Sequence, residues 1–224
     1  MATDPLAGSD LARVPLPENV YGFGWAEMRY LLGRHATPSS QMALTSLGFN
    51  AAPDDEVVAA AGVASLLARG LAAARGDQAT SRGEAAVLET VFARGLRWSG
   101  ISSRDGEHSE HGQHGDLMVV IEDGGIIAML QPRSLGTWFV GLNDEVDHPG
   151  PVLARAIEAM RQMQGGTGRF ALETRTLDGE PTTRFLWPTD GGWSVADLPE
   201  AERRPVSGAE LGAFLTRLLP PVRG

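Results

Sequence analysis

Residues 116–142, DLMVVIEDGGIIAMLQPRSLGTWFVGL, predict three consecutive antiparallel strands and therefore a protein built on a β-sheet. Leu117–Glu122 and Ile126–Gln131 are rich in β-branched and apolar residues, and only Asp123-Gly124-Gly125 separates them. That spacing and composition are typical of a tight hairpin. A third strand is predicted at Thr137–Leu142. Because a three-stranded sheet has a face that must be covered, the rest of the chain has to supply helices.

The C-terminal part of the sequence repeats one order of elements: a strand, a proline-containing turn, a tryptophan-containing strand and a helix. Pro132 and Trp138 mark the first copy, and Pro188 and Trp193 mark the second. We interpret the repeat as two βββα-like units, either related by a pseudo-twofold axis or forming successive parts of one sheet. Trp138 and Trp193 are then expected to anchor equivalent core positions, with a surface role as binding anchors as the alternative.

The predicted fold class is α+β: an antiparallel sheet, or sheets, from the two βββα-like units, preceded by an N-terminal helical segment. Residues 1–20 form a flexible leader and 21–224 a single domain, in which 21–95 is mainly helical, 96–166 is the first unit and 167–224 the second. Capping-box pairs, Ser81 with Glu84 and Ser207 with Glu210, mark two helix starts. Hydrophobic periodicity predicts helices at Trp25–His35, Val57–Ala74, Ser81–Arg94, Val152–Gln164 and from Ser207, with a break at Thr37–Ser40, and further strands at Leu96–Ser102, Arg169–Thr176, Thr182–Trp187 and Trp193–Ala196.

The composition is that of an ordinary globular protein and removes several kinds of chemistry. The 224 residues are 42% hydrophobic and 21% charged. The absence of cysteine excludes disulfides, thiolate catalysis, iron–sulfur clusters and cysteine-type zinc sites. All 19 basic residues are arginine, which we take to reflect the GC-rich coding typical of actinobacteria.

The sequence carries no signal for a membrane. No run approaches the roughly 18–20 apolar residues that span a bilayer. The first 20 residues lack the positive and apolar regions of a signal peptide. We therefore expect a cytoplasmic protein without membrane insertion.

The balance of charge disfavours nucleic acid as a partner. The net charge is −9 and the sequence pI is near 5.0, whereas a protein that binds the phosphate backbone needs a positive field. Within residues 54–94, a helix that ends in an arginine-glycine-leucine step is followed by a polar turn and a second helix, an order typical of a winged helix. A winged helix would make the protein a DNA-binding or regulatory protein. Its first helix offers only Arg69 for contact with bases, so a pair of core-forming helices is the simpler interpretation.

A histidine-rich stretch, SRDGEHSEHGQHG at residues 103–115, is the one candidate for metal binding. It contains His108, His111 and His114 with Glu107 and Glu110 between them. Converging imidazoles could bind zinc, nickel or copper. A polar connection between two strands explains the same residues, so we assign no metal ligand and leave metal binding through this loop as a third hypothesis.

No motif for a catalytic nucleophile is present, neither Gly-x-Ser-x-Gly nor His-Glu-x-x-His. Glu173, Arg175 and Arg184 could form a polar constellation across two strands, but cross-strand charge pairing explains them. His35 and His148 stand beside predicted helix ends, where loop histidines are common. We assign no catalytic and no cofactor-binding residue and expect no cofactor, which leaves catalysis unsupported.

Three stretches together resemble the EspG family, the cytosolic chaperones of actinobacterial type VII secretion that bind PE/PPE or related helical substrates. They are VAAAGVASLLARGL (58–71) with the helix that follows, GTWFV (136–140), and GEPTTRFLWPTDGGWSV with GAELGAFLTRLL (179–219). The resemblance covers about three quarters of the chain by the arrangement of elements. It implies an α+β protein-binding chaperone or adaptor that holds a helical client through a hydrophobic patch and loops. It does not indicate the binding face or the oligomeric state.

Overall fold

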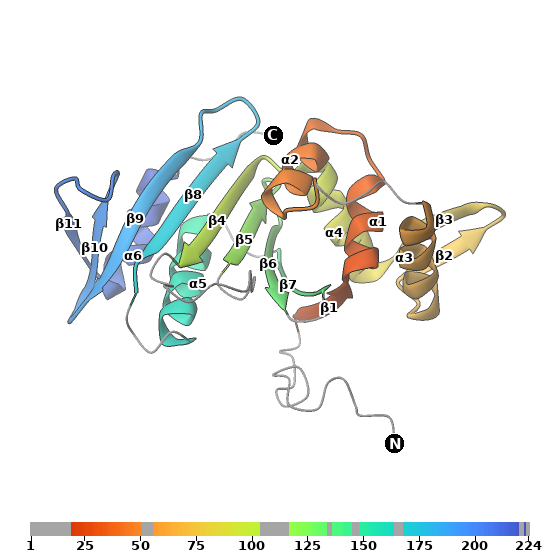
Figure 1. Cartoon of the computed structure of the whole chain (residues 1–224), viewed down its shortest axis with the longest axis horizontal. Coiled ribbons are helices and arrows are strands. Elements are labelled where there is room, and N and C mark those ends of the chain that lie inside the picture. The colour runs from red at the N-terminus through yellow and green to blue at the C-terminus, as the bar shows by residue number, and fades with distance from the viewer. Residues whose placement is uncertain are drawn as a thin grey trace, which may run out of the picture.

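The computed structural model describes residues 19–50, 56–103, 117–133, 136–144, 148–163, 168–219 and 222. Within this part, nine strands form one antiparallel sheet in the order β1-β7-β6-β5-β4-β8-β9-β10-β11, and β2 and β3 form a separate hairpin (Figure 1). The α+β class predicted from the sequence is confirmed. The strands are β1 (Val20–Gly24), β2 (Ala72–Arg75), β3 (Gln78–Ser81), β4 (Arg97–Ser103), β5 (Leu117–Glu122), β6 (Ile127–Arg133), β7 (Thr137–Asn143), β8 (Phe170–Thr176), β9 (Thr182–Thr189), β10 (Gly192–Ala196) and β11 (Arg204–Ser207).

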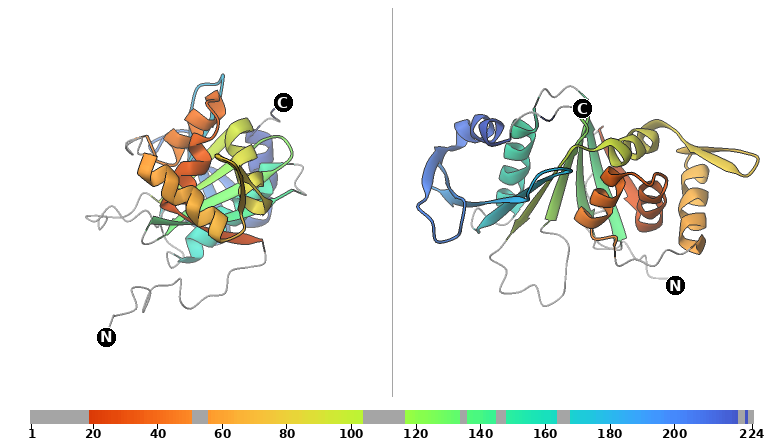
Figure 2. Two further views of the ribbon diagram at one scale, coloured as in Figure 1. Left: turned by 90° about the vertical axis from the view of Figure 1, so that its right-hand side faces the viewer. Right: turned by 90° about the horizontal axis from the view of Figure 1, so that it is seen from above.

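The helices cover the two ends of the sheet on opposite faces, as the right-hand view of Figure 2 shows. The helices α1, α2 and α4 lie over β4–β7, whereas α5 and α6 lie over the other face, toward β8–β11. Two hydrophobic cores result, and β5 contributes to both because its side chains alternate: Val119 and Ile121 enter the first core, Met118 and Val120 the second. The helices are α1 (Trp25–Gly33), α2 (Pro38–Ser46), α3 (Glu56–Ala68), α4 (Gly83–Arg94), α5 (Pro149–Met163) and α6 (Leu211–Leu218).

The two predicted βββα-like units share one continuous sheet and do not form two separate sheets. They meet where β4 pairs with β8, with Arg97 opposite Thr176. Trp138 and Trp193 are both core residues, 7% and 2% exposed, but they lie in separate cores on opposite faces of the sheet. Their positions nevertheless correspond, because Trp138 pairs with Pro132 and Trp193 pairs with Pro188, each in the core of its own half of the sheet. The two cores lie on opposite faces because the helices approach the two halves of the sheet from opposite sides.

The helix predicted over Val57–Ala74 is too long, because α3 ends at Ala68. Gly70 follows it with a φ of +74°, a backbone conformation that glycine adopts readily and that ends helices. The next residues, Ala72–Arg75, pair with Gln78–Ser81 as the hairpin β2–β3. The helix pair of the winged-helix hypothesis is therefore separated by a hairpin, and α3 packs against α1. A helix-turn-helix motif requires a short turn between its helices, whereas the hairpin β2–β3 joins α3 to α4.

Three helix starts also differ from the sequence-based predictions. The predicted break at residues 37–40 is the start of α2, where the Thr37 side chain accepts a hydrogen bond from the backbone N–H of Ser40 at 3.1 Å. Ser81 belongs to β3 and donates its hydroxyl hydrogen bond to Glu89, so the capping box predicted there is wrong. Ser207 does donate to Glu210, at 2.7 Å, but the residues between form a 3-10 turn before α6 begins.

The buried carboxylate of Glu27 fixes the position of α3. It is 3% exposed and accepts hydrogen bonds from the backbone N–H of Gly24 at 2.8 Å, from Ser65 at 2.7 Å and from Arg69 at 2.7 Å. These donors belong to β1, to α3 and to the residue that follows α3. Because a buried carboxylate needs such partners, Glu27 ties the N-terminal strand and α3 to α1.

Candidate protein-binding surface

One face of the strands β8–β11 carries no helix within the described part of the chain. In Figure 1 this face of β8 and β9 is turned toward the viewer, and α6 lies behind the strands. The covered side of the same strands holds Phe170, Leu186 and Trp193 in the second core. The uncovered side holds partly exposed residues, including a Glu173–Arg175 ion pair whose side chains are 39% and 38% exposed. Phe185 and Trp187 on this surface are both half-buried and so reach solvent in part.

Arginine and aromatic side chains stack on each other across this surface. The guanidinium carbon of Arg203 lies 4.0 Å from the ring centroid of Trp187, and that of Arg169 lies 5.9 Å from the ring of Phe185. The rings of Phe185 and Trp187 are 6.2 Å apart and tilted by 37°. We call this surface the arginine–aromatic face and define it by Arg169, Glu173, Arg175, Phe185, Trp187 and Arg203.

Stacking on Trp187 holds the exposed guanidinium of Arg203 in place for contact with a partner. A guanidinium that lies flat on an aromatic ring is attracted by the ring's π-electrons and leaves its N–H donors at the edge. Arg203 is exposed, and its position over Trp187 lowers the entropy that a contact would cost. Aromatic and arginine side chains are also the types enriched where protein interfaces gain most of their free energy.

The sequence contains one signal for this face that its motifs did not reveal. Phe185, Leu186 and Trp187 are three successive apolar residues in a strand, and successive side chains point to opposite faces. Leu186 is buried in the second core, so Phe185 and Trp187 have to lie on the other face. Which face the helices would leave open could not be read from the sequence.

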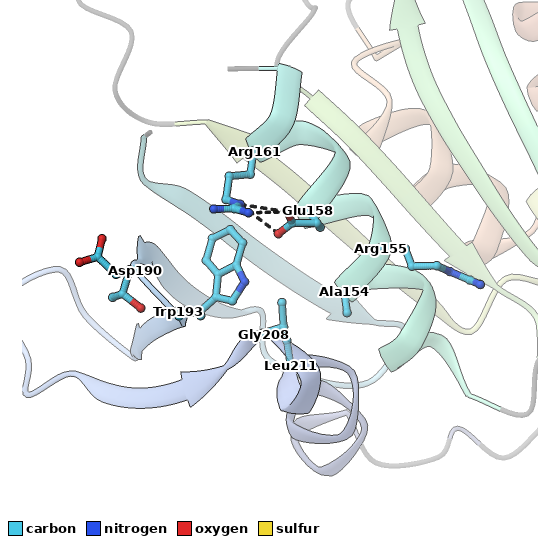
Figure 3. A pocket seen from close by; sticks show the side chains of 11 residues that line it. Ala154, Arg155, Glu158, Arg161, Asp190, Trp193, Gly208 and Leu211 are labelled. Atoms are coloured by element: carbon cyan, nitrogen blue, oxygen red, sulfur yellow. Dashed lines mark hydrogen bonds and ion pairs between the residues drawn. The ribbon is translucent and has the colours of Figure 1, made fainter. Parts of the chain in front are cut away.

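On the covered side of the sheet, a cavity of about 480 Å³ opens between α5, the turn before β10 and the start of α6 (Figure 3). Trp193 and Leu211 supply its apolar lining, and Asp190 lies at its rim. Glu158 accepts three hydrogen bonds from Arg161, at 2.6–3.1 Å, and these lower the pKa of the Glu158 carboxyl. Since this pair neutralises itself, the cavity favours docking of an apolar group over acid–base chemistry.

A buried ion pair lies within the sheet beside the cores. The Nη1 atom of Arg97 is 3.2 Å from a carboxylate oxygen of Glu122, and their side chains are 3% and 12% exposed. Burial raises the pKa of the Glu122 carboxyl, and the positive charge of Arg97 opposes that rise. This pair links β4 to β5 and faces a core, so we regard it as structural.

The polar residues singled out in the sequence do not come together. Glu173 pairs with Arg175 along one strand, whereas Arg184 pairs with Asp197 at 3.1 Å, so the constellation of the three is wrong. His35 contacts Glu89 at 2.7 Å, and the Nε2 of His148 donates to the carbonyl of Leu219 at 2.6 Å. Both histidines hold segments together.

The hypothesis of a metal at the histidine loop is not tested. His108, His111 and His114 lie outside the described residues. Among the residues that are described, no group of three or more histidine, aspartate or glutamate side chains is placed to hold a metal ion. In the same part of the chain, no helix is long and apolar enough to cross a membrane.

Comparison with known proteins adds a likeness of fold. No family model matches the sequence, and no curated protein matches it. Among the solved structures with a similar fold is the Mycobacterium tuberculosis type VII secretion system chaperone EspG5, determined in complex with a PE25–PPE41 dimer. The TM-score is 0.50 at 15% sequence identity, over 89% of this chain and 95% of that chain. At this identity the likeness concerns the fold.

Proposed function

We propose that this protein is a cytosolic chaperone or adaptor that holds a helical client protein of the type VII secretion class on its arginine–aromatic face. The observation that carries the proposal is the uncovered surface of β8–β11, with Trp187 and Phe185 partly exposed beside stacked arginines. Exposed apolar surface that is continuous and bordered by polar residues often marks a protein-binding site. The fold it shares with a secretion chaperone that was determined with two bound proteins supports the same conclusion.

The nature of the surface suits holding rather than transforming a molecule. The arginine–aromatic face provides flat apolar area and hydrogen-bond donors, which bind and orient a partner. The carboxylate of Glu173 is already engaged by Arg175. A broad surface of this kind fits the side of a helix better than it fits a small substrate, which needs a concave site.

The test is co-expression of the protein with each small helical protein encoded beside its gene, followed by size-exclusion chromatography with light scattering. We expect a stable complex with at least one such protein. Trp187→Ala should weaken that complex about 30-fold or more, the loss typical of a central aromatic anchor of about 2 kcal/mol. Arg217→Ala, on α6 at the other side of the sheet, is the matched control and should leave affinity unchanged.

Circular dichroism of each variant shows whether the fold is kept. A complex that forms with full affinity after Trp187→Ala, in a folded variant, would exclude this face as the client site. The absence of a complex with every co-expressed candidate would contradict the chaperone function itself.

A further inference from the structure

We infer that the cavity between α5, the turn before β10 and the start of α6 binds a small neutral molecule with a ring-sized apolar body and a carbonyl that accepts a hydrogen bond from the Trp193 indole. The cavity lies on the covered side of the sheet, so this site is separate from the proposed client surface. An unpartnered donor, the apolar lining and the balance of charge at the cavity define the ligand.

The donor is the indole N–H of Trp193, a side chain that is 2% exposed. The ring of Phe170 lies edge-on to the indole at 5.8 Å between centroids, and the guanidinium carbon of Arg161 lies 5.9 Å from the ring. Among the described residues, no atom accepts a hydrogen bond from the Nε1–H of Trp193. Figure 3 shows this nitrogen turned toward the part of the cavity that Ala154 and Gly208 line. Because a buried indole normally has an acceptor, a ligand in the cavity would complete this hydrogen bond.

A comparison with Trp98 shows why the position of the Trp193 nitrogen matters. The Nε1 of Trp98 also lacks a hydrogen-bond partner, but it is fully enclosed in the first core. The Nε1 of Trp193 is not among the enclosed unpartnered atoms of the described residues, and it borders a cavity of about 480 Å³. Pockets that hold small molecules measure about 300–1,000 Å³, so this cavity has room for such a ligand.

The lining of the cavity determines the rest of the ligand. The Trp193 ring and Leu211 are its large apolar groups, which suit an apolar body. Its charged residues carry two charges of each sign and are Arg155, Glu158, Arg161 and Asp190. Glu158 and Arg161 already pair with each other. Because these charges sum to zero, the cavity has no excess charge to compensate for taking an ion out of water, and a neutral acceptor is favoured over a carboxylate.

An apolar side chain of another protein would fit this cavity less well than a small carbonyl compound. Such a side chain would remove water from the Trp193 N–H without replacing its hydrogen bond, which costs free energy. The carbonyls inside a helix are already engaged by the N–H groups of that helix, so a docked helix would not supply an acceptor. A ketone or an amide of a small molecule supplies the apolar body and the acceptor together.

Three small probes separate the parts of the ligand. Acetophenone carries an aromatic ring and a neutral carbonyl, benzoate has a carboxylate in place of the ketone, and ethylbenzene has the ring without an acceptor. Each probe is added at the same concentration to isotope-labelled full-length protein, and the indole N–H peaks are followed by NMR. The peaks of Trp193 and Trp98 are identified as the ones that disappear in Trp193→Phe and in Trp98→Phe.

We expect acetophenone to bind with a Kd on the order of 1 mM, as is typical of so small a ligand. It should move the Trp193 proton peak downfield, the direction of hydrogen-bond formation, and leave the Trp98 peak in place. Benzoate and ethylbenzene should bind at least about threefold more weakly, because one is charged and the other has no acceptor.

Two variants test the contacts, with acetophenone binding measured by ligand-observed NMR. Trp193→Phe removes the donor but keeps an aromatic ring, and it should weaken binding about three- to tenfold. Trp138→Phe, at the corresponding position in the first half of the sheet, is the matched control and should leave binding unchanged. Ala154→Leu enlarges a side chain on the cavity wall, keeps the indole and should abolish binding.

Circular dichroism shows whether each variant keeps its fold. A Trp193 peak that moves no more than the Trp98 peak, equal affinity for the three probes, or wild-type affinity in folded Trp193→Phe overturns the inference. If Trp193→Phe does not fold, wild-type affinity in Ala154→Leu overturns it instead. A Trp193 peak that responds to a bound client protein but to none of the probes would make the cavity a protein-docking site and would refute the small ligand.

Discussion

Because α1 and α3 pack closely, a glycine-to-alanine substitution in α3 should lower the stability of the fold, whereas the same substitution in α6 should not. Gly62, in the middle of α3, lies against the backbone of α1: a Cβ atom there would be 2.2 Å from the carbonyl oxygen of Ala26 and 2.9 Å from the Cβ of Tyr30. Gly212, in α6, has room: its Cβ would be 3.4 Å from the nearest atom, in Pro151. Glycine-to-alanine changes at these positions therefore test the packing directly.

The magnitude follows from the distances. Alanine in a helix interior is favoured over glycine by about 1 kcal/mol, which is the gain expected at most for Gly212→Ala. At Gly62 the closest ordinary carbon–oxygen contact is about 3.3 Å, so α1 and α3 would have to separate by about 1 Å. This movement would stretch the contacts of Ser65 and Arg69 with Glu27, and overpacking of this kind costs about 1–3 kcal/mol net.

Urea unfolding followed by circular dichroism measures both variants against the wild type, and hydrogen exchange of α3 amides locates the change. We expect Gly62→Ala to lower the free energy of unfolding by about 1–3 kcal/mol and to reduce protection in α3. Gly212→Ala should be neutral or slightly stabilising. If Gly62→Ala is as stable as the wild type, α3 is not held against α1 as described.

Other polar contacts give three further predictions. Glu27→Gln removes the charge that faces Arg69, and urea unfolding should show a loss of about 1–3 kcal/mol; an unchanged stability would contradict a role for this ion pair. Arg97→Met alone should lower the free energy of unfolding by about 3–5 kcal/mol because the Glu122 carboxylate stays buried without its partner. The double variant Arg97→Met with Glu122→Leu should lie within about 1 kcal/mol of the wild type. Additive losses in this double-mutant cycle would refute the reasoning. Because burial raises the pKa of Glu122, the wild type should lose stability relative to that double variant as pH rises from about 4.3, the ordinary value for glutamate, through the higher value in the folded protein. Unfolding at a series of pH values measures this difference, and a difference that does not change with pH, or that changes in the opposite direction because the charge of Arg97 outweighs burial, would contradict the raised pKa.

Local sequence signals predicted the strands around the hairpin well. At Asp123-Gly124-Gly125 the Asp123 carboxylate accepts hydrogen bonds from the backbone N–H groups of Gly125 and Ile126, and Gly124 has a φ of +93°. These are properties that the residue types themselves favour, so the turn and its flanking strands could be placed from the sequence. β5 begins and ends where it was predicted.

Elements that depend on distant partners were missed. β1 was not predicted, because its pairing with β7 joins Val20 to Gly141, far apart in the chain. β11 is short and contains Pro205, which disfavours a strand. Ala72–Arg75 has the composition of a helix but pairs as β2, since tertiary context overrides weak local preference.

The candidate surface was missed for a similar reason. The strand that carries Phe185 and Trp187 was predicted, but the sequence drew attention to Trp138 and Trp193 as the anchors. Whether an aromatic residue is buried or open depends on which side the helices take, and this is decided by packing over the whole chain.

The edges of the large sheet explain why its face is the better binding surface. At the β1 edge, the carbonyl of Gly22 accepts a hydrogen bond from Arg69 and the N–H of Gly24 donates to Glu27, so these edge groups are already satisfied. At the β11 edge, Pro205 has no N–H to offer and the strand is four residues long. A partner that added a strand would find few unpaired groups at either edge. A partner that keeps its own backbone hydrogen bonds, as a helix does, has no such requirement, and the arginine–aromatic face offers it side-chain contacts alone.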